Sequence, residues 1–410
     1  MLILDFRYLR AIRRFLDCDI ISYCHDVDRY LVVNDKRFSP IVDEILVNLK
    51  SIDIKIGGLA SPGSKFVWER GFSNPIPTNF LFRLSNSLRY FNFLLPSKLK
   101  SNNASLLSVL FSFSKARILL GIGIPPSLSR AARSAGLTVI EIAHGYGACN
   151  PEFRLPFEDK KSAPQFYLVF EEAHEKVKKR LADLEIEAVI VPNPSVYRFK
   201  NGCRQSAKGK QAKATRKTEV EFSKNILVSL QWGYDNDSPL YYQLSGIIKN
   251  GILHEEIIKV IDKTPNIHWQ LRLHPVQLMD NRYEHHKLWL EDFVKRRLNC
   301  EWELASKSHF LDIVNSCDGH LTMQSSSCYE AAAVGVRSLC LCPALQKGGR
   351  NFGRFARLEN EGFVVVGEAK SKILETWVSN VKPANARISQ TQHLNFPQMI
   401  EFLKENLINV

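Results

Sequence analysis

What the sequence lacks excludes several large classes of protein. No C-x-x-C pair occurs among its nine cysteines, so neither a zinc ribbon nor a thioredoxin-type redox motif is indicated. No apolar run approaches the roughly 18 residues that a membrane-spanning helix needs. The N-terminus also has no apolar stretch with a small-residue cleavage site, as a signal peptide would. The scattered, odd set of cysteines fits a reducing compartment, so we expect a cytoplasmic protein.

The chain does have the size and composition of a folded protein with two domains. Its 410 residues are too many for one ordinary hydrophobic core. Hydrophobic residues make up 45% of the chain, which is typical of a globular protein rather than a disordered one. Lys and Arg number 55 against 42 acidic residues. This surplus attracts nucleic acid, anionic lipid or a charged substrate, although solubility alone explains it equally well.

A linker is predicted near the middle of the chain. Residues 200–224 are polar, basic and nearly free of large apolar side chains, which separates an N-terminal domain at 1–199 from a C-terminal domain at 225–410. In both halves, short apolar runs alternate with helical patterns, as expected for βαβ units. The predicted fold class is therefore α/β, with two Rossmann-like doubly wound domains that face a cleft.

The predicted strands can be given by their residue ranges. In the first half they lie at 29–34, 53–59, 117–121, 137–143, 165–170 and 188–191. In the second half they lie at 225–230, 267–273, 301–304, 319–323, 337–341 and 363–366.

Polar groups follow the strand at 267–273. Arg272 and His274 would share one face of this strand, and Pro275 would end it and open a helix. Ligands of an open parallel sheet bind outside the carboxyl ends of the strands, and a guanidinium beside an imidazole suits a pyrophosphate. The alternative is a half-buried strand with a solvated polar face. That alternative fits a parallel sheet less well, because its strands are usually covered on both faces.

A run of hydroxyls follows the strand at 319–323. Free N–H groups and the helix dipole favour an anion at a helix start, so Ser325, Ser326 and Ser327 are predicted to hold phosphate. Glu330 would then reach the ribose hydroxyls. In the competing interpretation, Ser327 and Glu330 form a capping box that satisfies backbone N–H groups. The serines can serve both purposes, whereas the two roles compete for Glu330.

Two other strand ends carry candidate residues. His144 follows the strand at 137–143 and could act as a general base or bind a sugar or phosphate. Gln231 follows the first strand of the second half and could close over a base or ribose. In each case an ordinary turn is the alternative. Lys347 and Arg350 are weaker phosphate candidates in a loop that is equally consistent with simple solvation.

Neither a metal site nor a definite membrane segment is predicted. Asp-x-Asp spacings occur at 17–19, 26–28 and 235–237, but so short a pattern is common by chance and none follows a convincing phosphate-site strand. The basic, apolar segments at 6–16 and 78–116 either lie on an anionic membrane surface or pack on the domain as helices.

In combination, these motifs resemble a known family. Arg272-Leu-His-Pro275, Thr322-Met-Gln-Ser-Ser-Ser327 with Glu330, and His144-Gly145 are similar to motifs of GT-B glycosyltransferases. More narrowly, they resemble bacterial capsule and lipopolysaccharide enzymes, including CMP-sialic acid and CMP-Kdo transferases. The glycerophosphotransferases of teichoic acid synthesis share a similar pattern. The resemblance covers about residues 117–366.

The resemblance implies roles for individual residues. His274 would contact the donor phosphate, the three serines would hold the same group, and His144 would lie on the acceptor side. The N-terminal third matches no family motif, so the resemblance assigns no catalytic base there. Asp26, Asp28 and Asp35 are candidates.

The implied activity is transfer of a sugar from a nucleotide-activated donor, with CMP-linked sugars as one option. The acceptor would be a surface polysaccharide or a lipid-linked glycan, and no metal or other cofactor is expected. A polyol-phosphate transferase of the CDP-glycerol type and a sugar-nucleotide epimerase remain as alternatives. Nucleic-acid binding is not expected, because the sequence lacks interleaved aromatic and basic motifs. Peripheral contact with the anionic inner face of a membrane would be compatible with the basic surface.

Overall fold

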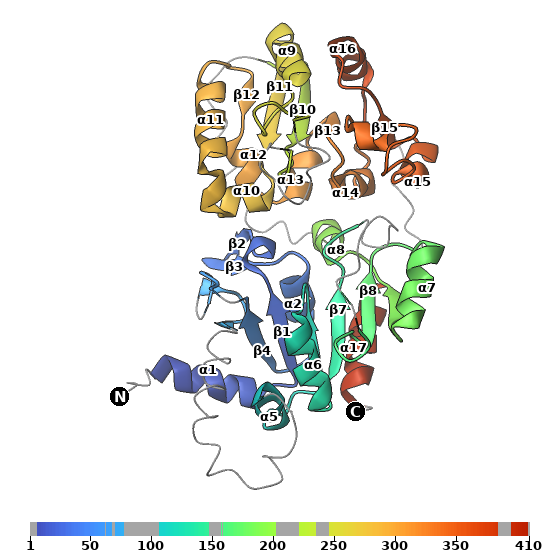
Figure 1. Ribbon diagram of the computed structural model, residues 1–410. Coiled ribbons are helices and arrows are strands. Elements are labelled where there is room, and N and C mark those ends of the chain that lie inside the picture. The colour runs from blue at the N-terminus through green and yellow to red at the C-terminus, as the bar shows by residue number, and fades with distance from the viewer. Residues whose placement is uncertain are drawn as a thin grey trace. The chain divides into compact units, whose positions relative to one another are not determined.

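The chain forms two compact units. The computed structural model describes residues 6–61, 63–67, 70–77, 106–146, 157, 159–201, 221–234, 246–383 and 395–408. The first unit comprises Met1–Arg198 with Thr391–Val410, and the second comprises Phe199–Gln390. Each unit contains one parallel β-sheet with helices around it (Figure 1).

The first unit is built on a sheet with the strand order β5-β4-β1-β6-β7-β8-β9. Its strands are β1 (Ile20–Cys24), β4 (Ile56–Ala60), β5 (Ile76–Pro77), β6 (Ile118–Gly121), β7 (Thr138–Ile142), β8 (Phe166–Val169) and β9 (Glu187–Ile190). A separate antiparallel hairpin joins β2 (Leu31–Val33) to β3 (Lys36–Phe38). Its turn places Asn34 and Asp35 at φ values of 50° and 60°, as tight hairpin turns require.

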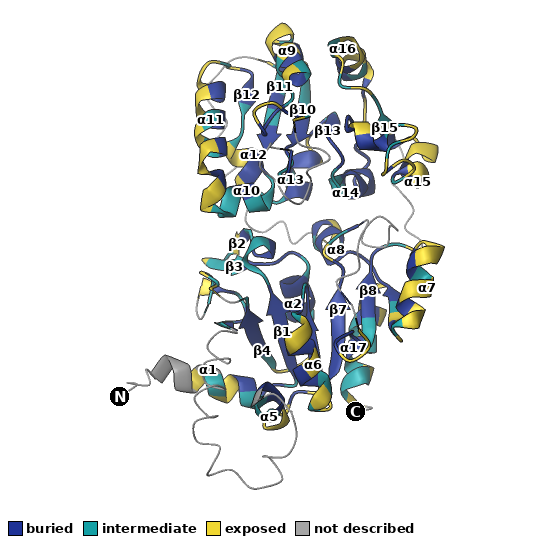
Figure 2. Cartoon of the chain, viewed as in Figure 1, coloured by how far each residue is buried: buried dark blue, intermediate teal, exposed yellow. Residues whose placement is uncertain are grey.

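Helices cover this sheet and bury its central strands. They are α1 (Phe6–Leu16), α2 (Val42–Lys50), α5 (Leu106–Ser112), α6 (Pro126–Ser134), α7 (Glu175–Asp183), α8 (Pro194–Lys200) and α17 (Phe396–Ile408). Every residue of β1 and β7 is buried, as expected for parallel strands that are covered on both faces (Figure 2). Ser39 and Asp43 fix the start of α2, because Ser39 Oγ accepts from Val42 N at 3.1 Å and Asp43 Oδ2 accepts from Ser39 N at 2.7 Å.

The last helix, α17, belongs to the first unit although it follows the second unit in sequence. Phe402 packs edge-on against Phe166 of β8, with ring centroids 5.2 Å apart. Arg117 Nη1 donates to the carbonyl oxygen of Leu407 at 2.7 Å. The predicted C-terminal domain at 225–410 therefore contained a helix that packs elsewhere. The linker prediction missed this because an apolar helical pattern does not reveal which sheet it covers.

The second unit has the strand order β12-β11-β10-β13-β14-β15. Its strands are β10 (Lys224–Ser229), β11 (Ile267–Arg272), β12 (Cys300–Glu301), β13 (Gly319–Thr322), β14 (Ser338–Cys340) and β15 (Val364–Val366). Its helices are α9 (Glu255–Lys263), α10 (Pro275–Met279), α11 (Glu284–Lys295), α12 (Glu303–Lys307), α13 (Phe310–Val314), α14 (Ser327–Ala333), α15 (Ala356–Asn360) and α16 (Ser371–Asn380). All strand pairs in this sheet are parallel.

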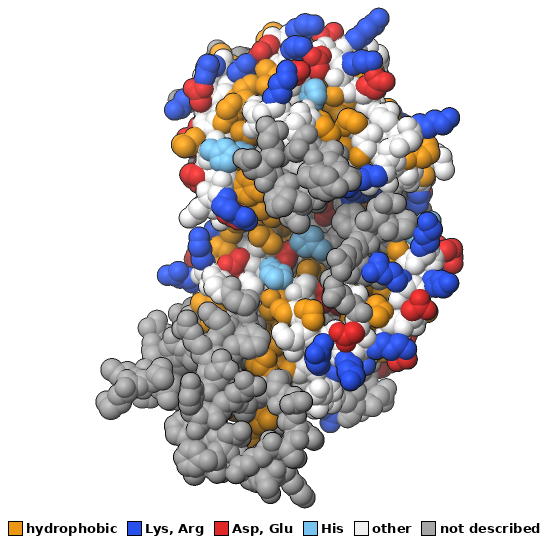
Figure 3. Space-filling view, in the orientation of Figure 1, with side chains coloured by type: hydrophobic (Ala, Val, Ile, Leu, Met, Phe, Trp, Pro, Cys, Tyr) orange, Lys and Arg blue, Asp and Glu red, His pale blue; other side chains and the backbone are white. Residues whose placement is uncertain are grey.

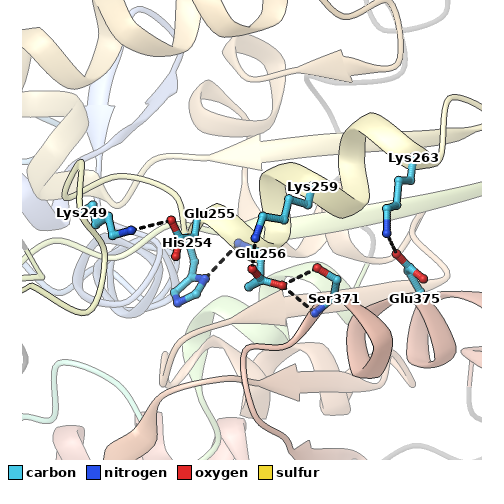
Figure 4. Close-up of polar contacts among 8 residues, drawn as sticks. All are labelled: Lys249, His254, Glu255, Glu256, Lys259, Lys263, Ser371 and Glu375. Atoms are coloured by element: carbon cyan, nitrogen blue, oxygen red, sulfur yellow. Dashed lines mark hydrogen bonds and ion pairs between the residues drawn. The ribbon is translucent and has the colours of Figure 1, made fainter.

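A polar network ties α9 to α16 on the surface of the second unit (Figure 4). The Glu256 carboxylate accepts from Ser371 N at 2.9 Å and also from the Ser371 hydroxyl. Lys263 of α9 forms an ion pair with Glu375 of α16 at 2.8 Å. Glu256 therefore supplies a negative charge at the start of α16, where backbone N–H groups lack partners within the helix.

The two doubly wound, parallel α/β units confirm the predicted fold class. In the second half a strand lies at or beside each predicted range, although Leu304 falls in α12 rather than β12. In the first half the prediction missed β1, the strand from which the sheet extends in both directions. The predicted strand at 29–34 instead forms the short β2 of the hairpin. A run of only five residues between polar neighbours gave too weak a signal for β1.

Candidate functional site

The strand orders locate the expected ligand-binding edge of each sheet. Ligands of open parallel sheets bind outside the carboxyl ends of the strands, at the point where the chain reverses its direction of travel across the sheet. In the first unit this point lies between β1 and β6. In the second unit it lies between β10 and β13. Each edge is described separately below.

In the first unit, a carboxylate and an imidazole meet at this edge. Asp28 lies in a short 3₁₀ helix (Asp26–Asp28) after β1, and His144 follows β7. His144 Nδ1 is 2.9 Å from Asp28 Oδ1. The Asp28 side chain is 9% exposed, whereas that of His144 is 66% exposed. Because the carboxylate accepts from Nδ1–H, the lone pair of the ring lies on Nε2, as a general base requires.

The loop that carries Asp28 is held from below by a buried arginine. Arg29 is fully buried, and its Nη1 donates to the carbonyl oxygen of Cys24 at 3.1 Å. Its Nε lies 3.7 Å from Asp43 Oδ2 on α2. Through Arg29, the loop is joined to the end of β1 and to α2. The position of Asp28 therefore depends on these buried contacts as well as on its own contact with His144.

A third ionisable side chain, Glu141, lies beneath this pair on β7. Its carboxyl accepts from the backbone N–H groups of Gly123 at 2.5 Å and Ile124 at 3.2 Å. Burial raises the pKa of Glu141 to about 8, with a further contribution from the charge of Asp28. His25 Nε2 lies 3.2 Å from the carbonyl oxygen of Gly123, and a Cβ at that glycine would lie 2.7 Å from the same nitrogen. The loop after β6 is thus held on both sides.

The other two candidate aspartates, Asp26 and Asp35, lie in different settings from Asp28. Asp26 accepts from the Ser64 hydroxyl and from Lys65 N at 2.8 Å. Asp35 lies exposed in the hairpin turn, so Asp28 is the candidate aspartate that contacts His144. Residues 235–237 lie outside the described residues. Within the described part of the chain, no cluster of three His, Cys, Asp or Glu side chains is arranged to hold a metal ion.

In the second unit, Gln231 links the ends of β10 and β13. Its Oε1 accepts from Gln324 N at 2.6 Å and lies 3.4 Å from the Thr322 hydroxyl. The Gln324 side chain in turn accepts from Asn351 Nδ2 at 2.7 Å. Gln231 thus joins two strand ends at the reversal point. Gln231 was predicted to close over a ligand. In the structure its side-chain oxygen Oε1 already accepts a hydrogen bond within the unit.

The three predicted serines lie half-buried at the start of α14. Ser325 Oγ accepts from Ser327 N at 3.2 Å, and Arg354 Nη2 donates to Ser326 Oγ at 2.9 Å. The predicted capping box is not formed, because Ser327 is already the first helical residue and the N-cap residue Ser326 makes no side-chain cap bond. Glu330 lies in the first turn of this short helix and is half-buried. Sequence reasoning missed Arg354, which lies in the same basic segment as the weaker candidates Lys347 and Arg350.

A buried histidine, His320, lies next to the last of these serines. His320 of β13 has no exposed surface, and its Nδ1 lies 2.9 Å from Ser338 Oγ. Its Nε2 lies 2.8 Å from Ser229 Oγ and 3.4 Å from Ser327 Oγ. This residue was also missed by the sequence analysis. The sequence did offer one indication of its role, because His320 is a polar residue within a short strand that is otherwise largely apolar.

His274 and Pro275 take the positions that the sequence predicts. Pro275 opens α10, and His274 is its N-cap residue, with Nδ1 accepting from Val276 N at 3.2 Å. Gln277 Oε1 completes a capping box by accepting from His274 N at 3.0 Å. Because Nδ1 is the acceptor, the neutral ring carries its proton on Nε2. The ring of Trp232, after β10, lies 6.2 Å from that of His274.

Arg272 does not lie beside His274 at the sheet edge. Its side chain is buried, with 6% of the residue exposed. Its Nη1 donates to the carbonyl oxygens of Ala305, within α12, and of Ser308, the C-cap residue of that helix, the latter at 2.9 Å. The guanidinium also lies over the ring of Phe310. The prediction that Arg272 and His274 jointly present a cation and an imidazole to phosphate is therefore corrected: Arg272 supports the fold beneath His274.

Solved structures resemble this chain over almost its whole length. No protein-family model and no curated protein matches the sequence. The UDP-GlcNAc 2-epimerase of Methanocaldococcus jannaschii, in complex with UDP-GlcNAc and UDP, superposes with a TM-score of 0.53 at 12% identity, covering 95% of this chain and 99% of that one. The wall teichoic acid polymerase TagF superposes with a TM-score of 0.52 at 9% identity, covering 98% and 86%. This chain has the GT-B fold. At such identities the similarity establishes the fold alone.

The UDP-GlcNAc 2-epimerase of Neisseria meningitidis, bound to UDP-GlcNAc, gives a comparable match. Its TM-score is 0.52 at 12% identity, covering 95% of this chain and 100% of that one. Similarity to the GT-B fold thus agrees with the sequence resemblance at the level of architecture. The structural similarity does not support the narrower resemblance to capsule and lipopolysaccharide enzymes.

The surface charge of this GT-B protein is not gathered into one region of the face drawn in Figure 3. Over the described residues of that face, Lys and Arg side chains are interspersed with Asp and Glu side chains (Figure 3). No helix in the described segments is long and apolar enough to cross a bilayer.

Proposed function

We propose that this protein is a glycosyltransferase that moves a sugar from a nucleotide-activated donor to a hydroxyl of a glycan or lipid-linked acceptor. The observation that carries the proposal is the exposed His144 ring, which Asp28 holds at the carboxyl edge of the first sheet. His144 Nε2 would take the proton of the acceptor hydroxyl as the new glycosidic bond forms. Asp28 would stabilise the imidazolium that results.

The second unit would bind the donor. His274 Nε2–H can donate to a phosphate oxygen, and the half-buried hydroxyls of Ser325 and Ser326 lie at the end of β13 with Arg354 beside them. When the bond between sugar and phosphate breaks, negative charge accumulates on the leaving phosphate. Donors already fixed in position stabilise that charge without reorganising, which lowers the barrier.

A sugar-nucleotide epimerase is the second candidate. Two GT-B structures that superpose with TM-scores above 0.5 are UDP-GlcNAc 2-epimerases in complex with their nucleotide sugar. An epimerase also needs ionisable groups beside the sugar, and Asp28 and His144 could supply them. It needs no acceptor, however, which separates the two functions experimentally. A polyol-phosphate transferase would use the same phosphate-binding residues and would differ in its donor.

Two experiments test the proposal: nucleotide binding first, and then the dependence of donor consumption on an acceptor. Thermal unfolding is measured with CMP-, UDP-, GDP-, dTDP- and CDP-linked compounds, and one class is expected to raise Tm. With that donor, product analysis is then repeated with and without glycan acceptors. Consumption of donor only with an acceptor supports a transferase, and conversion to an epimer without one supports the epimerase. If no compound raises Tm of the folded protein, the donor site is refuted.

A further inference from the structure

Helix α1 presents a cationic face on the first unit. Its sequence contains four arginines and no acidic residue. Arg10, Arg13 and Arg14 are exposed and, at their spacing of three and four residues, lie along one side of the helix. The opposite side is anchored in the core, where Phe15 is 3% exposed and lies 5.8 Å from the ring of Phe111. The arginines therefore face outward on a helix that is fixed in place.

A hollow lined by both apolar and charged side chains lies directly beside these arginines. Its volume is about 440 Å³, and it is lined by Ile12, Arg13, Leu16, Asp17, Phe113 and Lys115. Phe113 is 69% exposed, so its ring is accessible to a partner at the edge of this hollow. Asp17 is matched by two lysines, Lys115 at 2.6 Å and Lys55 at 3.2 Å, so these three residues together leave a net positive charge.

This surface lies at the edge of the first sheet opposite to the His144–Asp28 pair. Lys115 N donates to the carbonyl oxygen of Leu16 at 2.9 Å, and Arg117 N donates to that of Asp19 at 3.0 Å. Asp19 and Arg117 immediately precede β1 and β6, so these contacts lie at the N-terminal edge of the sheet. In Figure 1, α1 lies at the end of this sheet away from the β2–β3 hairpin. A partner bound at α1 would leave the carboxyl edge of the sheet open.

The geometry points to an anionic phospholipid bilayer as the partner of this surface, which comprises Arg10, Arg13, Arg14, Phe113 and Lys115. A bilayer offers phosphate groups to the cations and an apolar boundary layer to an exposed aromatic ring at the same depth. Helix α1 would lie in the plane of the interface and would not insert across it. The proposal goes beyond the proposed transferase activity and does not depend on it.

Vesicle co-sedimentation of the full chain tests this proposal. We expect binding to vesicles that contain phosphatidylglycerol and little binding to pure phosphatidylcholine. The triple variant R10Q/R13Q/R14Q should bind on the order of 100-fold more weakly, since each basic residue near a bilayer surface contributes about one factor of five. The matched control is K176Q/K179Q/R180Q, which removes three exposed charges from α7 of the same unit and should bind like the wild type.

A second variant tests the apolar contribution. Phe113→Ser should weaken vesicle binding roughly tenfold at high salt, where electrostatic attraction is screened, and should leave Tm nearly unchanged because the ring is exposed. If both triple variants weakened vesicle binding equally, the binding would depend on overall charge, and the proposed surface at α1 would be refuted. Displacement of the protein from vesicles by duplex DNA, with tighter binding to that DNA, would refute the lipid assignment. The nucleotide-induced Tm shift of the α1 variants should match the wild type, so failure here is distinguishable from failure of the proposed function.

Discussion

The strand-end groups of the first unit are ionisable, whereas those of the second unit are mainly neutral hydrogen-bonding groups. In the first unit Asp28 contacts His144, and Glu141 lies buried below them. In the second unit Gln231 and Thr322 link strand ends, and serine hydroxyls surround the buried ring of His320. The two sheets have the same parallel architecture, so the difference lies in the side chains that follow the strands.

This contrast separates two chemical tasks. An exposed imidazole that a carboxylate orients can accept and release a proton, which is needed at a reacting hydroxyl. A network of hydroxyls and amides cannot, but it can fix donors around a phosphate at little reorganisation cost. We therefore expect substitutions in the first unit to change rate and those in the second to change affinity.

The largest effect is expected at His144. His144→Ala should lower the rate of sugar transfer by roughly 10²- to 10⁴-fold, because the proton of the acceptor hydroxyl loses its base. Asp28→Asn should lower the rate less, since the ring remains but loses the charge that stabilises its protonated form. The measurement is initial rate with saturating donor, together with the nucleotide-induced Tm shift, which should stay as in the wild type.

An exposed histidine elsewhere in the same unit provides the control. His174 is the exposed N-cap residue of α7, and His174→Ala should leave the rate unchanged. Loss of the nucleotide-induced Tm shift in His144→Ala would contradict the division of tasks, because it would place His144 in the donor site.

The next largest effect is expected for His274, and the chain contains a close structural match for it. His254 caps α9 in the same unit with the same geometry, its Nδ1 accepting from Glu256 N at 3.2 Å. Both alanine variants lose a helix cap. His274→Ala alone should also lose a charge-assisted bond to phosphate, which weakens nucleotide affinity roughly 10- to 100-fold. Calorimetric titration measures the nucleotide affinity of both variants. Equal losses of affinity in His274→Ala and His254→Ala would contradict a role for His274 in donor binding.

The sequence allowed prediction of those parts of the site that depend on one strand and the turn after it. The positions of His144 and His274 directly after a strand could be predicted, because each follows an apolar run that ends at a glycine or proline. Pro275 opens a helix as its fixed φ dictates. Local pattern and backbone chemistry were sufficient for these positions, as they were for most strands of the second unit.

Contacts between distant segments could not be predicted in this way. Asp28 meets His144 only because β1 and β7 flank β6 in the sheet, and β1 itself gave too short a signal. Arg272 has the same alternation as His274, but its direction into the unit depends on the carbonyl groups of Ala305 in α12 and of its C-cap residue Ser308. Arg354 reaches Ser326 from a loop after β14 that no local motif marks. Tertiary packing decides each of these cases.

The buried carboxyl of the first unit is expected to affect stability rather than activity. The pKa of Glu141 is raised to about 8 in the folded chain from an ordinary value near 4.5, because burial disfavours its charge. Its contribution to stability is thus fully present below pH 4.5 and is lost as pH rises through 8. Relative to Glu141→Gln, the wild type should lose up to about 1.4 kcal/mol of unfolding free energy per pH unit across this window. Urea unfolding at several pH values measures this, and parallel curves would contradict it.

The smallest effect is expected in the surface network of the second unit, where adjacent glutamates differ in their partners (Figure 4). Glu255 pairs with exposed Lys249, and such a pair adds little stability. Hydrogen bonds from Lys259 and Ser371 lower the pKa of Glu256 to about 2, and its carboxylate also caps α16. Glu256→Gln should therefore lower Tm at pH 7 more than Glu255→Gln does. The difference should shrink as pH falls from 4.5 towards 2, because the unfolded chain then binds a proton at Glu256 that the folded chain takes up only near pH 2. Equal Tm values for the two variants at pH 7 would mean that the cap of α16 contributes no more than an ordinary surface ion pair.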